Sequence, residues 1–414
     1  MGDSLRPHRS TEARHRVVIV GGGVAALEAM LALRRLTRDR AAITLVAPER
    51  EFIFRPLVVG EPFGLGRAHR FDLAALAASA GAEVVNSKVV AVEADDHRVL
   101  TEDGRAIGYD ALIVAPGARM RLALAGALTV WGIADAAELG GLLVDLERGD
   151  AERVAFAIHP GAGWPLPLYE LALLTAAHLR HTGIGGRRLS IVTHEEEPLE
   201  IFGRTAAGYV RRLLDRYQVE LVAGHRPAAV RDGALVLASG ESFPADRVVS
   251  LPRLEGPRLA GIPADDRGFI PVDELGRVRA TPDVYAAGDA TAFTIKQGGL
   301  AAQQAYAAAT AIARRAGAAV DPEPFRPVLR GVLLTGGEPS FVLGDLGEPA
   351  AVNGARGQLN GESTAARLDT LWWPPGKVAG RFLAPHLDEI AGHSLAPPRP
   401  VNGSSFAVEV EVEA

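Results

Sequence analysis

Apolar runs separated by glycine-rich turns dominate the first part of the chain. Residues 16–20 (RVVIV) form a continuous β-branched run, as expected for a parallel strand that is buried on both faces. Residues 21–36 pass from glycine into apolar positions at helical spacing, and residues 42–46 (AITLV) form a second buried run. This strand–turn–helix–strand order predicts half of a doubly wound parallel sheet.

The same order recurs further along the chain. Residues 153–158 (RVAFAI) predict a strand, residues 168–180 a helix, and residues 189–197 (LSIVTHEEE) another strand. Between the two units, residues 98–118 predict a hairpin followed by a buried strand, and later residues 298–320 predict one long Ala-rich helix. A chain of 414 residues also exceeds one ordinary domain, so we expect an α/β protein with two such units.

The composition and net charge exclude several classes of binding site and reaction. The net charge of −6 provides no basic surface for nucleic acid. The chain contains no cysteine, which excludes disulfides, thiolate nucleophiles, cysteine-ligated zinc and iron–sulfur clusters, and no metal site is predicted. Residues 1–15 are polar and are expected to be a tail without a signal sequence. No apolar run is long enough to span a membrane, so a cytoplasmic location is expected.

The turn after the first strand carries a phosphate-binding pattern. Gly21, Gly23 and Ala26 match G-x-G-x-x-G/A, in which glycines permit a tight turn and a close backbone approach to a pyrophosphate. The helix that starts at Val24 would present free N–H groups and a partial positive charge to that group. An acid is expected at the end of the second strand, where it would bind ribose hydroxyls. Glu49 is the candidate, although it lies two residues beyond the expected position. The alternative is a tight turn without a ligand and a solvated carboxylate.

Two further motifs indicate which dinucleotide is bound. Residues 109–118 (YDALIVAPGA) and 281–291 (TPDVYAAGDAT) stand in the order and spacing of flavoprotein reductases with two dinucleotide domains. Over about residues 16–315 the chain resembles the FAD-dependent pyridine nucleotide-disulfide oxidoreductase superfamily. Within that superfamily it is most similar to the branch of type II NADH dehydrogenases and sulfide:quinone oxidoreductases. The resemblance implies FAD as the cofactor.

The resemblance assigns FAD contacts to both motifs. Gly288 would permit a close approach of the backbone to FAD, and Asp289 would accept hydrogen bonds from the ribityl hydroxyls of FAD. The alternative for this pair is a loop that caps the next helix. Ala115, Pro116 and Gly117 correspond to the point where the chain leaves the FAD domain beside the cofactor.

Four other positions complete the site that the resemblance implies. Val89 matches the position whose backbone meets the adenine, and Arg55 either supplies positive charge to a phosphate or reduced flavin or is a surface arginine. Lys296 and Gln297 precede a helix whose N-terminus is implied to lie near the pyrimidine end of the flavin, where the helix dipole stabilises negative charge. Lys296 either shares this electrostatic role or is a solvated side chain.

The implied fold class is α/β, with two Rossmann-like three-layer dinucleotide-binding domains and a smaller C-terminal region. An NAD(P)-like domain is expected to be inserted into the FAD domain. The expected boundaries are 16–118 and 263–317 for the FAD domain, 119–262 for the inserted domain and 318–414 for the C-terminal region. In the last region, residues 331–336 and 340–346 predict short strands.

Residues 159–171 (HPGAGWPLPLYEL) occupy the phosphate-binding position of the second unit. A nicotinamide site of this family carries a glycine triplet and a further glycine before a glutamate. Alignment on Glu170 places Trp164 within the triplet and Pro165 at a later glycine position. Pro165 and Pro167 also lack backbone donors, so NAD(P)H is a doubtful cosubstrate of this chain.

The degraded turn instead resembles that of sulfide:quinone oxidoreductases, which do not bind nicotinamide there but need a cysteine pair. Because this chain has no cysteine, sulfide oxidation by that mechanism is excluded, as are disulfide reductase and peroxidase activities. Glu170 matches a family glutamate that is implied to handle protons near the flavin. The alternative is an acid that favours the helix dipole. We interpret His159 as a structural histidine.

The segment 368–390 combines aromatic and basic residues, including Trp372, Trp373 and Lys377, as suits a bilayer interface. Its prolines and acidic end oppose that interpretation, and packing on the FAD domain or across a homodimer interface is the alternative. The expected partners are therefore a small-molecule electron donor and acceptor, with peripheral contact at the inner face of a membrane or a second copy of the chain as further options.

Three functional hypotheses follow. In the first, the protein is an FAD-dependent oxidoreductase that passes electrons from a small donor, NAD(P)H included, to a quinone or similar acceptor. In the second, the same scaffold uses a donor that is neither a nicotinamide nor a thiol. In the third, the protein binds FAD without catalysis.

Overall fold

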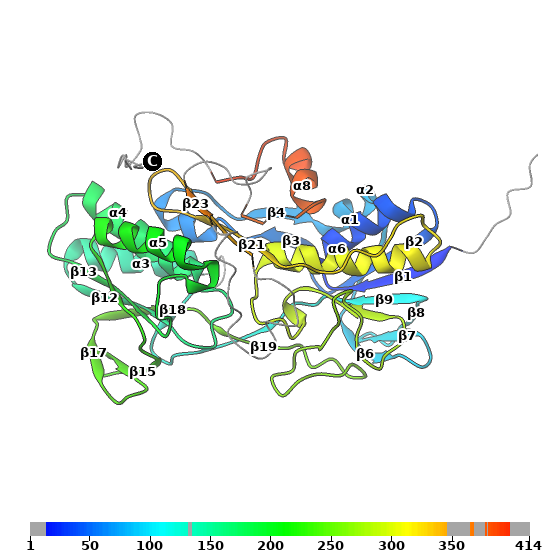
Figure 1. Cartoon of the computed structure of the whole chain (residues 1–414), viewed down its shortest axis with the longest axis horizontal. Coiled ribbons are helices and arrows are strands. Elements are labelled where there is room, and N and C mark those ends of the chain that lie inside the picture. Colours follow the sequence, from blue (N-terminus) through cyan, green and yellow to red (C-terminus); the bar gives the residue numbers. More distant parts are fainter. Residues whose placement is uncertain (1–13, 131–134, 346–364, 368–376, 379, 398–414) are drawn as a thin grey trace, which may run out of the picture.

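The structure is a computed structural model that describes residues 14–130, 135–345, 365–367, 377–378 and 380–397. Two five-stranded parallel sheets lie side by side, one toward each end of the molecule (Figure 1). Each sheet carries helices on one face and a three-stranded antiparallel sheet on the other. The predicted α/β class with two Rossmann-like units is confirmed.

The first sheet has the strand order β20-β9-β1-β2-β5. Its strands are β1 (His15–Val20), β2 (Ala41–Ala47), β5 (Glu83–Asn86), β9 (Ala111–Val114) and β20 (Val284–Ala286). Val20 lies opposite both Val46 and Val114, so the carboxyl ends of β1, β2 and β9 reach one edge of the sheet. His15, expected in the tail, is part of β1 and pairs with Ala41.

The first unit has three layers, because successive side chains of β1 point to opposite faces of the sheet. Val17 and Ile19 pack under helices α1 (Val24–Thr37), α2 (Leu73–Ser79) and α6 (Gly298–Arg315). Val18 and Val20 face the opposite layer, which consists of β6 (Val89–Glu93), β7 (Arg98–Thr101) and β8 (Ala106–Gly108). The predicted helix over 298–320 is shorter, because it ends at Arg315 and Gly317 takes a left-handed conformation (φ 79°).

The second sheet has the strand order β11-β18-β12-β13-β14. Its strands are β11 (Leu128–Thr129), β12 (Arg153–Ile158), β13 (Arg188–Thr193), β14 (Val219–Val222) and β18 (Arg247–Ser250). The accompanying helices are α3 (Asp135–Arg148), α4 (Leu166–His181) and α5 (Arg204–Tyr217). The opposite layer contains β15 (Pro227–Arg231), β16 (Ala234–Leu237) and β17 (Ser242–Pro244). The prediction of a strand over 189–197 was wrong at its end, because β13 stops at Thr193 and the charged residues after it form a turn.

Several segments of the described ranges join the units, two of them antiparallel strand pairs. The antiparallel pair β10 (Arg119–Arg121) and β19 (Arg253–Glu255) carries the chain into and out of the second unit. The hairpin of β3 (Glu51–Phe54) and β4 (His69–Asp72) encloses the short helix η1 (Val58–Phe63), whose Val59 packs in the same apolar cluster as α4. The domain boundaries given above remain a prediction.

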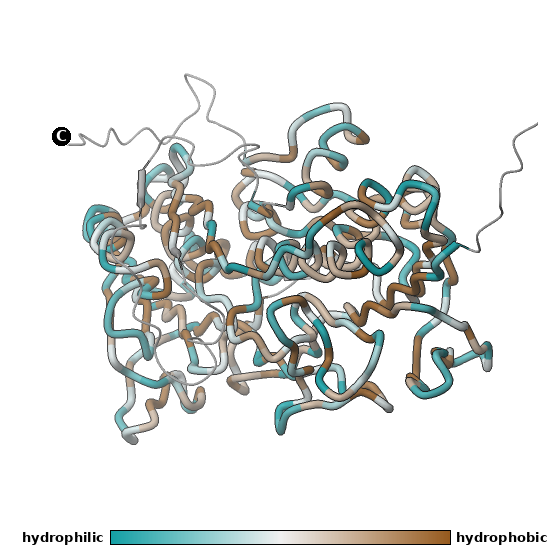
Figure 2. Tube along the Cα trace, turned by 45° about the vertical axis from the view of Figure 1, so that its right-hand side comes forward, coloured by the Kyte–Doolittle hydropathy of each residue, from teal (hydrophilic) through white to brown (hydrophobic). Residues whose placement is uncertain are grey.

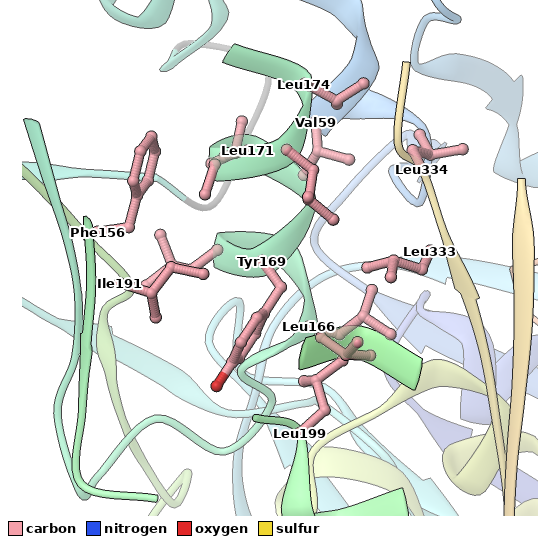
Figure 3. Packing of buried hydrophobic residues seen from close by; sticks show 14 of the residues in the cluster. Val59, Phe156, Leu166, Tyr169, Leu171, Leu174, Ile191, Leu199, Leu333 and Leu334 are labelled. Carbon is pink, nitrogen blue, oxygen red and sulfur yellow. The ribbon is translucent and has the colours of Figure 1, made fainter. Parts of the chain in front are cut away.

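The C-terminal region adds β21 (Val328–Leu333), β22 (Ser340–Asp345), β23 (Ala365–Arg367) and helix α8 (Leu383–Ala391). Both predicted short strands therefore exist, although β21 begins earlier than expected. Leu333 lies close to Leu166 on α4 (Figure 3), and Leu334 belongs to the same apolar cluster, so this region packs on the second unit. Trp372 and Trp373 lie outside the described residues.

Hydrophobic stretches run through the central strands and helices, and hydrophilic stretches occupy the surface loops (Figure 2). Among the helices of the described ranges, none is both long enough and apolar enough to span a bilayer.

Candidate functional site

The turn after β1 is held tightly against the end of β9. Gly21 has φ 116°, and a Cβ atom on it would lie 2.2 Å from the carbonyl oxygen of Ala115. The Ala115 amide in turn donates to the Val20 carbonyl over 2.8 Å. Only glycine therefore fits at this position, as the sequence pattern predicts.

Gly23 borders open space. A Cβ atom placed on it would meet no described atom within 4 Å, and Gly23 is the N-cap of α1 without a side-chain capping bond. The first helical bond is accepted by its carbonyl from Leu27, so the amides of the turn that begins at Val24 have no helical acceptor. Free amides at a helix N-terminus beside open space fit the pyrophosphate of a dinucleotide.

The 3₁₀ helix η3 (Gly288–Ala290) brings a second segment to this place. Gly288 has φ 75°, and a Cβ on it would lie 2.9 Å from that of Ala25 in α1 and 3.4 Å from that of Ala301 in α6. The Gly288 amide donates to Gln304 Oε1 over 2.7 Å. The starts of α1 and α6 thus converge on η3, so the two sequence motifs form one site.

Asp289 is the acidic group at this junction. Its side chain is half-buried and makes no hydrogen bond to a described residue. Burial raises the pKa of the Asp289 carboxyl, and the positive charge of Lys296 opposes that rise. An acceptor with free lone pairs beside the turn fits sugar hydroxyls, as the resemblance implies.

Lys296 is buried, so its interpretation as a solvated side chain is wrong. It is 6% exposed, its Nζ lies 3.8 Å from the ring centre of Phe269, and it donates to the Thr291 carbonyl over 2.5 Å. Burial lowers the pKa of Lys296 to about 8, although Asp289 favours the charged form. The side chain of Gln297 is used structurally, because it accepts from Leu300 N and donates to the Arg330 carbonyl.

The other predicted contacts are more dispersed. Glu49 and Arg55 are exposed, with Glu49 just after β2 at the same sheet edge as Gly23 and Arg55 just after β3. Val89 is buried at the start of β6 in the opposite layer. Pro116 and Gly117 follow β9 at the carboxyl edge. No cluster of metal-ligating side chains occurs within the described ranges.

The equivalent turn of the second unit satisfies its own donors. The Gly161 amide donates to His159 Nδ1 over 3.0 Å, and the Ala162 amide donates to the His159 carbonyl over 3.0 Å. Because Nδ1 accepts, Nε2 carries the proton and donates to the Leu251 carbonyl over 3.1 Å. Burial lowers the pKa of His159, which favours this neutral form. The structural interpretation of His159 agrees with this geometry.

Apolar groups cover the start of α4. Pro165 is its N-cap and Pro167 lies in its first turn, while Leu166 is 1% exposed. The Cδ1 atom of Leu166 lies 2.8 Å from where a Cβ on Gly331 would stand, so β21 closes over this helix end. The Trp164 ring packs at 5.7 Å from that of Phe202.

The second turn also rests on the segment before α6. A Cβ on Gly163 would lie 2.7 Å from Lys296 Cγ, and the Lys296 amide donates to the Gly163 carbonyl over 3.0 Å. The degraded turn therefore contacts the same lysine that lies beside Asp289.

The sequence interpretation missed Glu195, which follows β13. An acid at this strand end binds ribose in a nucleotide-binding unit. Here Glu195 is buried, accepts from Tyr169 Oη over 2.7 Å and from Thr193 Oγ1 over 3.0 Å. Burial raises the pKa of Glu195 to about 7. The predicted strand over 189–197 included Glu195, so its place two residues beyond the strand end was not recognised, and its inward orientation depends on the bond from Tyr169 of α4 (Figure 3).

Glu170 is buried on the side of α4 that faces the C-terminal region. Its Oε1 accepts from the Leu334 amide over 2.9 Å and from Lys377 Nζ over 2.5 Å, and its Oε2 has no partner. Burial raises the pKa of Glu170, and Lys377 opposes that rise. Lys377 was noted in the sequence as part of a basic segment, without a signal that it pairs with Glu170.

Comparisons with known proteins agree with this architecture. The family model for pyridine nucleotide-disulphide oxidoreductases matches residues 15–309. An NADH dehydrogenase-like protein of Mycobacterium tuberculosis is 29% identical over 296 residues, which cover 67% of this chain and 73% of that protein. The sulfide-quinone reductase of Aquifex aeolicus is 26% identical over 267 residues, which cover 61% of each chain.

The crystal structure of the sulfide:quinone oxidoreductase from Aquifex aeolicus superposes with a TM-score of 0.75 at 20% identity, covering 94% of this chain and 100% of that one. This likeness shows a shared fold. Together with the family match over most of its length, it places the chain among FAD-dependent oxidoreductases. The chain belongs to the pyridine nucleotide-disulphide oxidoreductase family.

Proposed function

We propose that this protein is an FAD-dependent oxidoreductase that passes electrons from a small donor to a quinone-type acceptor without a redox-active cysteine. The observation that carries the proposal is the open turn at Gly23, which faces η3 and the start of α6 in a chain that has no cysteine. A thiol relay is impossible here, so electrons have to enter and leave through the flavin itself.

The residues of the first unit have distinct roles in this proposal. The amides that begin at Val24 hold the pyrophosphate, and Asp289 accepts hydrogen bonds from the ribityl hydroxyls. The N-terminal end of α6 favours negative charge on the ring system, and Lys296 adds a positive charge beside Asp289. The bound flavin supplies the electron-transfer chemistry.

Glu170 supports a quinone-type acceptor. Reduction of a quinone consumes protons, and a buried carboxyl with a raised pKa is suited to hold one. Its unpaired Oε2 is the atom that we propose holds the proton, while Oε1 stays bound to Lys377 and the Leu334 amide. The name of the relative from Aquifex aeolicus, a sulfide-quinone reductase, is consistent with this acceptor class.

Access to a lipid-soluble acceptor implies peripheral contact with a membrane. Ile390 on α8 is 48% exposed, at the end of the aromatic and basic segment. Flotation with vesicles of phosphatidylglycerol and phosphatidylethanolamine tests this part, and a protein that stays entirely in the soluble fraction would contradict it.

The second unit argues against a nicotinamide donor. The turn amides of Gly161 and Ala162 are bound internally, prolines remove two further donors, and Glu195 points inward. We therefore propose that the donor is neither a nicotinamide nor a thiol. A second candidate function, with NAD(P)H as the donor, is favoured by the similarity to an NADH dehydrogenase-like protein.

The experiment is an anaerobic titration of the purified holoprotein, followed through the visible absorbance of the flavin. NADH, NADPH, sulfide and a short-chain quinol are added separately. Bleaching by the quinol and reoxidation by its quinone, with no bleaching by NADH or NADPH, is expected. Rapid bleaching by NADH or NADPH would support the second candidate, and bleaching by none of the four would contradict the proposed quinone-type acceptor and favour an FAD-binding protein without catalysis.

A further inference from the structure

Glu28 of α1 is fully buried and bonds to a distant part of the chain. Its carboxylate accepts from the amides of Arg381 over 2.8 Å, Phe382 over 2.9 Å and Leu383 over 2.7 Å. Leu383 is the first residue of α8, so a carboxylate from the first unit caps the helix of the C-terminal region.

The residues just before α8 are fitted closely to both units. A Cβ on Gly380 would lie 2.7 Å from Glu28 Oε2, so only glycine permits this approach without displacement. A Cβ on Gly298, in the first turn of α6, would lie 3.0 Å from Val378 Cγ2. At the N-terminal end of this segment, Lys377 forms an ion pair with Glu170 on α4. We call residues 377, 378 and 380–383 the strap.

The strap crosses the elements that form the proposed FAD site. Its one end is bound to α1, five residues after Gly23, and its middle contacts the start of α6. The other end is bound to the second unit through the pair of Lys377 with Glu170, whose side chains are 8% and 1% exposed. In Figure 1, α8 stands above α1 and α6, where the strap joins it to the rest of the molecule.

The bonds of Glu28 are strongly directional. A buried carboxylate that loses three amide donors is left without solvation, so the strap and Glu28 hold each other in place. The other charged groups around Glu28 include Arg381, whose positive charge favours the ionised carboxylate, whereas burial raises the pKa of Glu28.

We propose that Glu28 is a positioning residue, which fixes the strap across the start of α6 and thereby seats Lys377 on Glu170. The inference rests on the FAD site proposed above but not on the identity of the donor or acceptor. Because α1 and α6 border both the strap and that site, FAD binding and docking of the strap are coupled, and each favours the other.

The test compares holoproteins that carry Glu28→Ala, Glu28→Gln or Asp388→Ala with the wild type. Asp388 provides the matched control, since its Oδ1 accepts from the Leu395 amide at the opposite end of α8. The readouts are limited proteolysis mapped by mass spectrometry over residues 377–397 and the midpoint potential of the flavin. Neither readout depends on turnover.

For Glu28→Ala we expect cleavage within the strap to be at least about tenfold faster, and a flavin potential that departs from the wild-type value. Glu28→Gln keeps a side-chain oxygen that accepts hydrogen bonds, so the strap should keep most of its protection against proteolysis. Asp388→Ala should expose only the residues after α8 and leave the potential unchanged. Wild-type protection in Glu28→Ala, or an equal shift of potential in Asp388→Ala, would overturn the proposal.

If Glu28→Ala does not fold, Lys377→Met tests the strap from its other end, and the same pattern of strap cleavage with a shifted potential is expected. Failure of the FAD proposal is recognisable separately. A wild-type protein that takes up no FAD refutes that site, whereas the difference in strap cleavage between Glu28→Ala and wild type is still measurable in the apoprotein.

Discussion

The two parallel-sheet units share one topology but treat the turn after their central strand in opposite ways. After β1, Gly23 borders open space and the amides at the start of α1 are free for a ligand. After β12, His159 takes the Gly161 amide, prolines begin α4, and Leu166 is buried under β21. A strand–turn–helix unit therefore indicates a dinucleotide site only when the donors of its turn are unoccupied.

The acids that follow the second strand of each unit differ in the same way. Glu49 is exposed beyond β2, at the edge where the first turn lies. Glu195, beyond β13, is buried and bound by Tyr169 from the adjacent helix. In the second unit, the groups that would bind a nucleotide instead stabilise the protein, and the predictions below test this contrast.

The largest effect is expected from filling the open turn. Gly23→Val places a side chain where the pyrophosphate is proposed to bind, while the backbone (φ −92°) accepts a β-branched residue. We expect FAD affinity to fall at least about 100-fold, which corresponds to about 3 kcal/mol, with the thermal unfolding of the apoprotein unchanged. Fluorescence titration with FAD measures this.

Gly185→Val is the matched control for that change, because no described atom lies within 4 Å of its added Cβ and it stands in the second unit. It should bind FAD like the wild type. If Gly23→Val also binds FAD normally, the proposed position of the pyrophosphate is wrong.

A glycine from each of the two turns should differ in its contribution to stability. Gly21→Ala forces a left-handed residue and brings Cβ to 2.2 Å from a backbone carbonyl, which costs about 3 kcal/mol or more. Gly163→Ala brings Cβ to 2.7 Å from Lys296 Cγ but requires no left-handed residue and no approach to backbone, so a smaller loss of about 1–2 kcal/mol is expected. Urea unfolding of both variants measures the difference, and equal losses would contradict it.

Glu195 should make stability depend on pH. Its pKa in the folded protein is about 7, above the ordinary 4.5, so the fold favours the protonated form. This contribution is present at low pH and is lost as pH rises from about 4.5 through 7. The free energy of unfolding of wild type, relative to Glu195→Gln, should fall by about 3 kcal/mol across this range. A pH-independent difference between the two proteins would refute the inward, desolvated position of Glu195.

The smallest effect concerns Lys296, where the two units meet. Its pKa of about 8 means that the side chain is charged at pH 6 and largely neutral at pH 9.5. FAD binding, which places an anion beside it, should weaken by about tenfold over that interval in the wild type. In Lys296→Met the affinity should already be low at pH 6 and should not change with pH. A wild-type affinity that is constant across the interval would show that Lys296 does not contact the charge of FAD.

Sequence patterns predicted the local parts of this molecule well. Continuous apolar runs located β1 and β12, because strands buried on both faces need apolar residues at every position. Gly21 was also predictable, since its conformation and its contact with Ala115 follow from the tight turn. The convergence of the first turn with η3 followed from the family resemblance and not from periodicity.

The missed features all depend on contacts between distant segments. Glu28 has the pattern of an ordinary helix acid, and only the strap, more than 350 residues later, buries it. Lys296 has the composition of a surface turn, and its burial needs Gly163 from the second unit. Neither local spacing nor residue type predicts such contacts. The sequence therefore left the role of Lys296 open and gave no indication that Glu28 is buried.

The most direct test of the central contrast is a calorimetric titration of the apoprotein, first with FAD and then with ADP-ribose, the part of a nicotinamide dinucleotide that a Rossmann turn binds. We predict saturable uptake of one FAD per chain and no saturable heat from ADP-ribose up to about 1 mM. An apoprotein that takes up no FAD, or a holoprotein that binds ADP-ribose well below that concentration, would contradict the account.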